Sequence, residues 1–237
     1  FLLSSSIAAA VDWRTAIAAT SVAALLAGPL ILGLGRDAPG ATSDGDGDGF
    51  TLAVLRNRAY LAAVGVYSFH NWELFGVRNW LPAFLISTSA IAAMETSEAF
   101  AGLLTGVMIS LGGVGNLVGG TLSDRFGRTN VIAVGLGTSA LISLVLGSLG
   151  WLPLPALVAL VLLYGFVLTM DSSPTSTTVT EVVDDDHVGT ALSVQSFVGF
   201  TTTVVSPVAF GAVLDSYGFA LAFPTLGVGA AVGVGSL

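Results

Sequence analysis

Two long apolar stretches of this sequence carry ionisable residues near their middle. His70 and Glu73 occur in the stretch 58–87, and Asp171 occurs in the stretch 155–181. An ionisable group at membrane depth is energetically costly, and such groups usually mark the route of a proton, an ion or a polar solute. We therefore take Glu73 and Asp171 as candidate proton or cation sites, and His70 as a candidate substrate or coupling contact.

Helical spacing brings these three groups to comparable depth. At about 1.5 Å per residue, His70 and Glu73 stand roughly 18 and 22 Å beyond Arg58, and Asp171 stands roughly 15 Å from Glu181. His70 and Glu73 are three residues apart, so they share a helix face and could exchange a hydrogen bond or a proton. The alternative interpretation is that these two side chains only satisfy one another inside a helical bundle.

Polar neighbours extend both groups. Asn71 and Trp72 follow His70 and are further candidate substrate or coupling contacts, and Ser172 adds a hydroxyl beside Asp171. Pro174 lacks a backbone N–H, so it predicts a flexible point in the second helix. The sequence contains no nucleophile elbow, zinc-protease or phosphate-loop motif, and we expect no enzymatic function.

The elements that must position these residues are membrane-spanning helices. Of the 237 residues, 54% are hydrophobic and only 9% are charged, whereas a soluble domain carries roughly 25% charged residues. Several uncharged stretches reach about 20 residues, which is enough to cross a hydrocarbon core as a helix. Breaks at Gly, Pro and charged residues delimit one partial and seven full helices, at about 1–11, 15–35, 58–87, 98–122, 129–149, 155–181, 188–213 and 218–237.

Small residues spaced by four suit close packing of such helices. The pairs are Gly102 with Gly106, Gly115 with Gly119, and Gly229 with Gly233. A glycine at the interface lets two backbones approach closely, which a multi-helix membrane bundle requires.

The stretch 36–57 separates two groups of helices. It is rich in Gly, Asp and Ala, too polar and flexible to pack as a domain, so we expect a linker. Its run from Asp44 to Gly49 begins like a calcium-binding loop, but Leu55 stands where the closing bidentate Glu belongs. We expect no metal site, and we interpret the acidic loops as solvated surface.

The arginines orient the helices. All seven basic residues are Arg, and with alternating spans most of them fall at loops on one side. The positive-inside rule then places this side, with the linker 36–57 and the loop 123–128, in the cytoplasm of a multi-pass protein of the cell membrane. Arg78 and Trp80 fall near the opposite face, where we expect a snorkelling arginine and an aromatic-belt tryptophan.

One short loop carries a specific pattern. Between the predicted helices 98–122 and 129–149 the sequence reads Gly120-Thr121-Leu122-Ser123-Asp124-Arg125-Phe126-Gly127-Arg128. The pattern G-x-x-x-D-R-x-G-R resembles the signature of the major facilitator superfamily, which lies in a cytoplasmic loop between the second and third helices of each six-helix half. The residues, their spacing, the flanking helices and the membrane side all match.

This motif is suited to act as a conformational latch. Its members are Gly120, Asp124, Arg125, Gly127 and Arg128. Gly127 permits a turn that few other residues adopt, and Asp124 suits the positive end of a helix while the arginines bridge to acidic groups. The resemblance implies a contact with the start of the fifth helix of the same half, here Gly189 to Ala191, made in one transport state and broken in the other.

The resemblance implies an all-α, polytopic transmembrane bundle. The segment 58–237 would be the C-terminal six-helix half, and 1–35 would hold the partial fifth helix and the sixth helix of the N-terminal half. The linker 36–57 would join the halves, and the remainder of the N-terminal half is missing from this truncated chain. The resemblance also implies that 58–87 and 155–181, the seventh and tenth helices, line the central cavity, and these are the helices that carry the buried charges.

The function implied is that of a secondary active transporter that moves a small solute by alternating access. The buried charges favour coupling to a proton or sodium gradient, as a symporter or an antiporter, with passive facilitation left open. The expected partners are a small-molecule solute, the lipid bilayer and the missing N-terminal half, without a nucleic acid or a cofactor. A non-transporting receptor or sensor on the same scaffold, and a membrane-embedded enzyme, are the alternatives.

Overall fold

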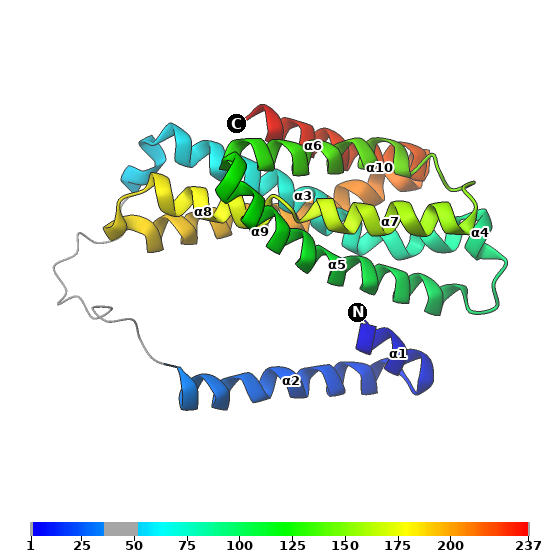
Figure 1. Cartoon of the computed structure of the whole chain (residues 1–237). Helices are drawn as coiled ribbons and strands as arrows, with labels where there is room; N and C mark the ends of the chain where they lie inside the picture. Colours follow the sequence, from blue (N-terminus) through cyan, green and yellow to red (C-terminus); the bar gives the residue numbers. More distant parts are fainter. Residues whose placement is uncertain (1, 36–51, 237) are drawn as a thin grey trace. The chain divides into compact units, whose positions relative to one another are not determined.

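The described residues of this computed structural model, 2–35 and 52–236, belong to two compact units (Figure 1). The first unit lies within Phe1–Phe50, and the second lies within Thr51–Leu237. All regular secondary structure in the described residues is helical, which confirms the predicted all-α class. Most of the predicted linker, 36–51, lies outside the described residues.

The first unit holds α1 (Leu2–Ala10) and α2 (Trp13–Leu34), which pack against each other. Asp12 caps α2, because its Oδ1 accepts hydrogen bonds from the backbone amides of Arg14 and Thr15 at 2.7 and 2.9 Å. A carboxylate at this position satisfies amides that lack a helical partner and offsets the positive end of the helix dipole. The helix α2 is long and apolar enough to span a membrane.

The second unit is a larger helical bundle. Its first part consists of the 3-10 helix η1 (Leu52–Arg56) and of α3 (Arg58–Ser87), α4 (Ser89–Ala92), α5 (Ser97–Phe126) and α6 (Arg128–Leu146). Its second part consists of α7 (Leu154–Leu168), α8 (Ser172–Val182), the 3-10 helix η2 (Asp185–His187), α9 (Val188–Tyr217) and α10 (Phe219–Gly235). The long helices run alongside one another in Figure 1. Their bounds agree with the predicted segments to within a few residues.

Most of these helices are apolar enough to cross a membrane. Among the described residues, five stretches qualify by length and composition, namely α2, α5, α6, α7 with α8, and η2 with α9. The apolar helix α10 is shorter, at 17 residues. The helix α3 has 30 residues but is not among the five, since its polar and charged side chains lower its hydropathy. The architecture is that of a polytopic membrane protein.

The polar helix α3 lies at the centre of the second unit, in contact with α5, α8, α9 and α10. At one end of the bundle, Nδ2 of Asn57 donates to the carbonyl of Val182 at 2.7 Å. The turn at Gly127 lies at the same end, because Arg128 beside it donates to Glu181 near the end of α8. We call this the Gly127 end. At the other end, the amide of Ser89 donates to the carbonyl of Gly150.

Apolar side chains pack toward both ends of α3. Toward the Gly150 side, Phe84, Phe210 and Phe223 form edge-to-face contacts within the largest cluster of buried residues. Toward the Gly127 end, Tyr60 packs in a smaller cluster with Ala191 and donates its hydroxyl to the carbonyl of Ala191 at 2.9 Å. The polar middle of α3 lies between these clusters along the helix.

The predicted helix 155–181 is two helices in the structure. The first, α7, ends at Leu168, and α8 begins at Ser172, so the interruption covers 169–171. Pro174 lies just after the interruption, in the first turn of α8, where a missing N–H removes no bond within the helix. The helix is therefore interrupted before Pro174, at 169–171, and the flexible point predicted at Pro174 itself stays a prediction.

The last part of the predicted linker also differs from expectation. Residues 52–56 form η1, and Asn57 caps α3 by accepting a hydrogen bond from the amide of Tyr60 at 3.2 Å. Val54 of η1 is buried in the cluster at the Gly127 end. This apolar contact makes 52–57 part of the second unit.

The helix α5 crosses α7 and α8 at short range. A Cβ built on Gly115 would stand 1.9 Å from the carbonyl oxygen of Phe166, and one on Gly119 would stand 1.8 Å from that of Met170. Only glycine leaves room for such an approach. This predicted glycine pair therefore presses α5 against the chain just before Asp171.

Candidate functional site

His70, Asp171 and Ser172 meet in the interior of the second unit. His70 comes from α3, whereas Asp171 and Ser172 stand at the start of α8. Nδ1 of His70 lies 3.0 Å from Oδ1 of Asp171, and Nε2 of the same ring lies 3.1 Å from Oγ of Ser172. Only 4% of His70 and 0% of Asp171 is exposed. The structure thus joins three of the predicted pathway residues across the two predicted helices.

Asp171 has few partners for a buried carboxyl group. It occupies the N-cap position of α8, but its side chain makes no capping hydrogen bond. Within the described part of the chain neither carboxyl oxygen has a hydrogen-bond partner, because the contact with His70 is close but not aligned as a hydrogen bond. Buried carboxyl groups normally require several donors or a proton of their own. A carboxyl group in this setting is chemically suited to bind and release a proton.

Glu73 is buried among a separate set of hydroxyl groups. Ser139 donates to its Oε2 at 2.7 Å, and Ser143 and Tyr164 donate to its Oε1 at 2.7 and 3.0 Å. Ser143 and Tyr164 also contact each other. The two serines stand one turn apart on α6, and Tyr164 belongs to α7. These donors stabilise a carboxylate in an apolar interior, and they join α3 to α6 and α7.

The exchange predicted between His70 and Glu73 is not formed. Among the described residues no hydrogen bond or ion pair joins the two side chains, because His70 contacts α8 while Glu73 contacts α6 and α7. Although they share one helix, the two groups thus have different partners. The interpretation in which they only satisfy one another is wrong for the same reason.

The polar neighbours on α3 are engaged in packing. Nδ2 of Asn71 donates to the carbonyl of Tyr67 at 2.8 Å, and Nε1 of Trp72 donates to the carbonyl of Thr225 on α10 at 3.1 Å. Pro174 is buried at the start of α8. The predicted role of Asn71, Trp72 and Pro174 in a solute pathway stays a prediction.

Arg78 and Trp80, which are predicted to lie near the membrane surface, both contact protein in this structure, and their roles at the surface stay predictions. The guanidinium of Arg78 lies over the ring of Phe75, 5.6 Å from its centroid. Nε1 of Trp80 donates to the carbonyl of Pro207 at 2.9 Å, and its rings stack on Phe210 with centroids 5.5 Å apart. Trp80 therefore holds α3 against α9, since its donor bonds to protein instead of to headgroups.

The signature loop forms a compact charged junction at the Gly127 end. The guanidinium of Arg128 donates to Ser123 Oγ at 2.6 Å, to Asp124 Oδ1 at 2.5 Å and to Glu181 Oε1 at 3.0 Å. Gly127 has a φ of 88°, a conformation that favours glycine. Because Glu181 is near the end of α8, Arg128 ties the turn between α5 and α6 to that helix.

The remaining members of the loop lie around this junction. A Cβ built on Gly120 would stand 3.0 Å from Oγ of Ser173, so Gly120 allows α5 to approach α8, and Arg125 is exposed. Within the described residues no hydrogen bond or ion pair joins the loop to the predicted partner, Gly189 to Ala191. The reason is that Glu181 supplies the carboxylate for Arg128, so α8 is the contacted helix in this structure.

The sequence interpretation missed the hydroxyl partners of Glu73. Ser139, Ser143 and Tyr164 stand in helices other than that of Glu73, so their association depends on how the helices pack. One signal was available: Ser139 and Ser143 are four residues apart and share a helix face. Intramembrane hydroxyl groups on one face often bond across helices.

Comparison with known proteins identifies the fold. The family model of the Major Facilitator Superfamily matches residues 74–237. The POT family transporter PepTSo, solved from crystals grown in meso, has a TM-score of 0.69 at 18% identity over 76% of this chain and 36% of its own. An auto-inhibited POT family peptide transporter has a TM-score of 0.63 at 17% identity, with the same two coverages.

These matches cover this chain far better than they cover the solved transporters, because it spans 36% of their length. No curated protein gives a match. At this level of identity the structural likeness shows the fold, whereas the family model shows membership, since it covers more than half of the chain. The helices, the signature loop and the family model agree: this integral membrane protein belongs to the Major Facilitator Superfamily.

Proposed function

We propose that the full-length protein is a secondary transporter that moves a small solute by alternating access, coupled to a proton or cation gradient. The observation that carries this proposal is the buried contact between His70 and Asp171, 3.0 Å apart across α3 and α8. Family membership supports transport as the class of function. The resemblance to facilitators implies that α3 and the α7–α8 pair line the central cavity, so the contact joins α3 to α8, the part of that pair that can move in this proposal.

The chemistry of the pair can convert proton binding into a change of helix contacts. While the imidazolium of His70 faces the carboxylate of Asp171, their attraction favours the packing of α3 against α8. Protonation of the Asp171 carboxylate leaves the imidazolium without its counter-charge, and deprotonation of the His70 ring leaves the carboxylate without its counter-charge. Among the described residues, Glu73 and Arg78 on the same helix are the other ionisable groups whose charge would favour or oppose a charge on the His70 ring.

The break between α7 and α8 lets these contacts change locally. The residues 169–171 interrupt the helix, so α8 can tilt without bending a continuous ladder of backbone hydrogen bonds. In this proposal α7 stays in place, because Gly115 of α5 packs on Phe166 and Tyr164 bonds to Glu73. Glu73 then acts as a fixed anchor, and the pair of His70 and Asp171 acts as the proton or cation site.

Peptides are the first solutes to test. The two solved transporters compared above are POT family transporters, and one is described as a peptide transporter. A proton is the first coupling ion to test, because imidazole and carboxyl groups both exchange protons readily.

The missing N-terminal half is the proposed partner of the exposed side of α9. Phe197, Phe200, Val204 and Val208 are exposed at helical spacing on this helix, and the chain spans 36% of the length of the solved transporters. The preceding half and the lipid would cover these side chains. In this proposal the Gly127 end faces the cytoplasm, because the positive-inside rule puts the arginine-rich loops on that side.

Uptake by the full-length protein in proteoliposomes tests the proposal. Gradient-driven accumulation should fall several-fold in Asp171→Asn, while solute exchange across the membrane persists, because the amide cannot exchange the proton. The matched control is Asp215→Asn, at an exposed aspartate near the end of α9, which should behave like the wild type.

The outcomes separate the alternatives. Unchanged gradient dependence in both Asp171→Asn and Glu73→Gln would remove the buried carboxyl groups from the mechanism. A wild-type protein that binds a solute but never moves it would favour a receptor on the same scaffold.

Ser172, His70 and Asp171 also stand in the order of a hydrolytic triad. The distances of 3.1 and 3.0 Å fit that order, but the group is enclosed in the bundle and the chain belongs to a family of transporters. We expect Ser172 to stay unlabelled by a fluorophosphonate, which reacts with activated serines. Labelling that disappears in Ser172→Ala would support an enzyme instead.

A further inference from the structure

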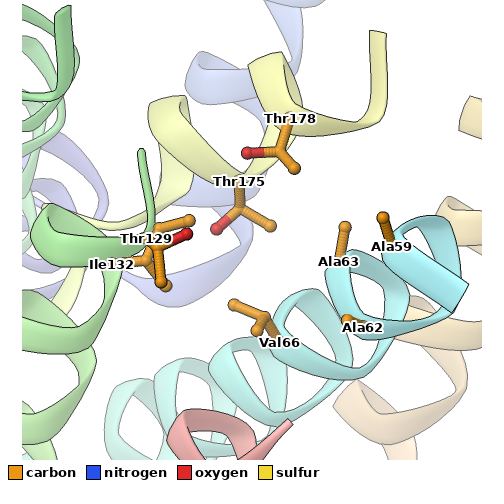
Figure 2. A pocket seen from close by; sticks show the side chains of 8 residues that line it. All are labelled: Ala59, Ala62, Ala63, Val66, Thr129, Ile132, Thr175 and Thr178. Atoms are coloured by element: carbon orange, nitrogen blue, oxygen red, sulfur yellow. The ribbon is translucent and has the colours of Figure 1, made fainter. Parts of the chain in front are cut away.

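A cavity opens at the Gly127 end of the second unit, between α3, α6 and α8. It has a volume of about 120 Å³, and Figure 2 shows side chains from the three helices arranged around it. On the α3 side Ala59, Ala62 and Ala63 repeat at helical spacing, and on the α8 side Thr175 and Thr178 do the same. The short alanine side chains leave the space that larger residues would fill.

The inner end of the cavity lies one helical turn from His70 and Asp171. Val66 lines the cavity and stands four residues before His70 on α3, while Thr175 lines it and stands four residues after Asp171. Four helical residues correspond to about 6 Å. The Oγ1 of Thr175 donates to the backbone carbonyl oxygen of Asp171 at 2.7 Å, so this lining residue contacts the backbone of the residue that carries the carboxyl group.

The lining offers acceptors for water along the α8 side. Thr175 and Thr178 donate their hydroxyl protons to the carbonyl oxygens of Asp171 and Pro174, at 2.7 and 2.9 Å. No described residue donates a hydrogen bond to either hydroxyl oxygen, so both can accept from water. At roughly 30 Å³ per molecule in the liquid, the volume of about 120 Å³ is enough for a few waters.

The His70–Asp171 site, beyond the inner end of the cavity, contains polar atoms that could hydrogen-bond to water. Both carboxyl oxygens of Asp171 and Nδ1 of His70 are buried without a hydrogen-bond partner in the described residues. Polar atoms of this kind are usually satisfied by buried water. The cavity lined by Val66 and Thr175, one helical turn away, is a source from which water could reach these atoms.

We infer that this cavity is a water-filled route by which hydronium ions reach the His70–Asp171 pair from the Gly127 end. The inference rests on the proposed function and adds to it a route inside the C-terminal half, separate from the space between the halves. A hydronium ion transfers its proton to the carboxylate of Asp171 and leaves as water. Val66 and Ile132 line the cavity toward its inner end, and the small alanine side chains of α3 leave the space through which water would reach it.

Cysteine labelling tests the hydration of the cavity without measuring transport. The chain contains no cysteine, so single cysteines can be introduced into it once any cysteine in the rest of the full-length protein has been replaced by serine. The test positions are Ala63→Cys and Thr175→Cys, because both residues line the cavity. Only 5% of Ala63 and 1% of Thr175 is exposed. We expect a charged methanethiosulfonate applied from the Gly127 side to modify both.

The control for labelling is Ala230→Cys, because Ala230 is buried in the apolar cluster of α3, α6 and α10. It should stay unmodified, while Asp186→Cys, at an exposed position of η2 at the same end, should react at once. Cysteines at 63 and 175 that react no faster than the cysteine at 230 would overturn the inference.

Filling the cavity tests whether it carries the coupling proton. Ala62→Phe places a ring in the space, whereas Ala83→Phe adds the same ring at an exposed position of α3. We expect Ala62→Phe, but not Ala83→Phe, to slow proton-driven uptake several-fold while solute exchange is retained. An equal loss of uptake and exchange in Ala62→Phe would mark a structural defect and count against the route.

The failure of the proposed function gives a different result. Wild-type uptake that is independent of any pH gradient would refute proton coupling, and the inferred route would fall with it even if both cysteines react. Unreactive cysteines in a protein with normal proton-driven uptake would refute the route alone.

Discussion

The closeness of α5 to α7 leads to a sharp prediction for Gly115→Ala. A Cβ at this position would stand 1.9 Å from the carbonyl oxygen of Phe166, whereas real Cβ atoms keep at least 3.0 Å from such an atom. The two helices must therefore separate by about 1.1 Å, the difference between these two distances. The obstacle is backbone, so no side-chain rotation can relieve it.

The net effect combines a packing cost with a gain in helix propensity. Overpacking costs typically up to about 3 kcal/mol, and alanine gains about 1 kcal/mol over glycine within a helix. We expect a loss of about 2 kcal/mol, which corresponds to a fall in melting temperature of roughly 4–8 °C for a unit of this size. Thermal unfolding of the full-length protein in detergent, followed by tryptophan fluorescence, measures this shift.

Gly113→Ala is the matched control on the same helix. Nothing lies within 4 Å of a Cβ built on Gly113, so only the propensity gain remains and the melting temperature should rise slightly. Equal melting temperatures for the two variants would refute the close crossing. A fall in both would show that glycine is needed in α5 for a reason other than contact with α7.

Three further predictions concern individual contacts. Trp80→Phe keeps an aromatic ring near Phe210 but removes the donor to Pro207. This loss should lower the free energy of unfolding by about 1 kcal/mol. In the same melting assay Trp151→Phe, at an exposed site, should have no effect. Arg128→Lys should slow solute uptake several-fold with little change in melting temperature, because lysine cannot bridge Asp124 and Glu181 as guanidinium does; normal uptake would exclude a role for the bridge. Hydrogen bonding from the Thr15 amide lowers the pKa of Asp12, so the cap of α2 should be fully formed at any pH above the usual pKa of an aspartate and should weaken as the pH falls through the lowered pKa. Hydrogen exchange of the Arg14 and Thr15 amides, corrected for intrinsic rates, should then accelerate at low pH in the wild type. In Asp12→Ala the corrected exchange rates should not depend on pH.

The helix positions and the helices that carry the site could be predicted from the sequence. Charges and glycines end most apolar stretches, so α5 and α6 meet at Gly127, which adopts the positive φ expected of it. The cost of burying His70 and Asp171 selects α3 and α8 without any knowledge of packing. The structure then brings these two residues to 3.0 Å.

The partners of each side chain could not be predicted, because they depend on how the helices rotate against one another. His70 and Glu73 share a face by spacing, yet they contact different helices. The break at 169–171 was equally hidden: Thr169 and Met170 are ordinary residues within a membrane helix, and Pro174 was the visible irregularity. Arg128 could bond to any nearby carboxylate, and only packing selects Glu181.

The polarity of α3 has a consequence for biosynthesis. A translocon releases a nascent helix into lipid according to its own hydrophobicity, and a Glu or Arg near the middle opposes that release. Because α3 carries Glu73 and Arg78 and is excluded from the five apolar spans, it is poorly suited to partition alone. Its insertion should wait for the serines of α6 and the tyrosine of α7, which supply the donors for Glu73. Ribosomes stalled before α7 has emerged should therefore hold α3 at the translocon, while the more apolar α5 has already moved into the bilayer.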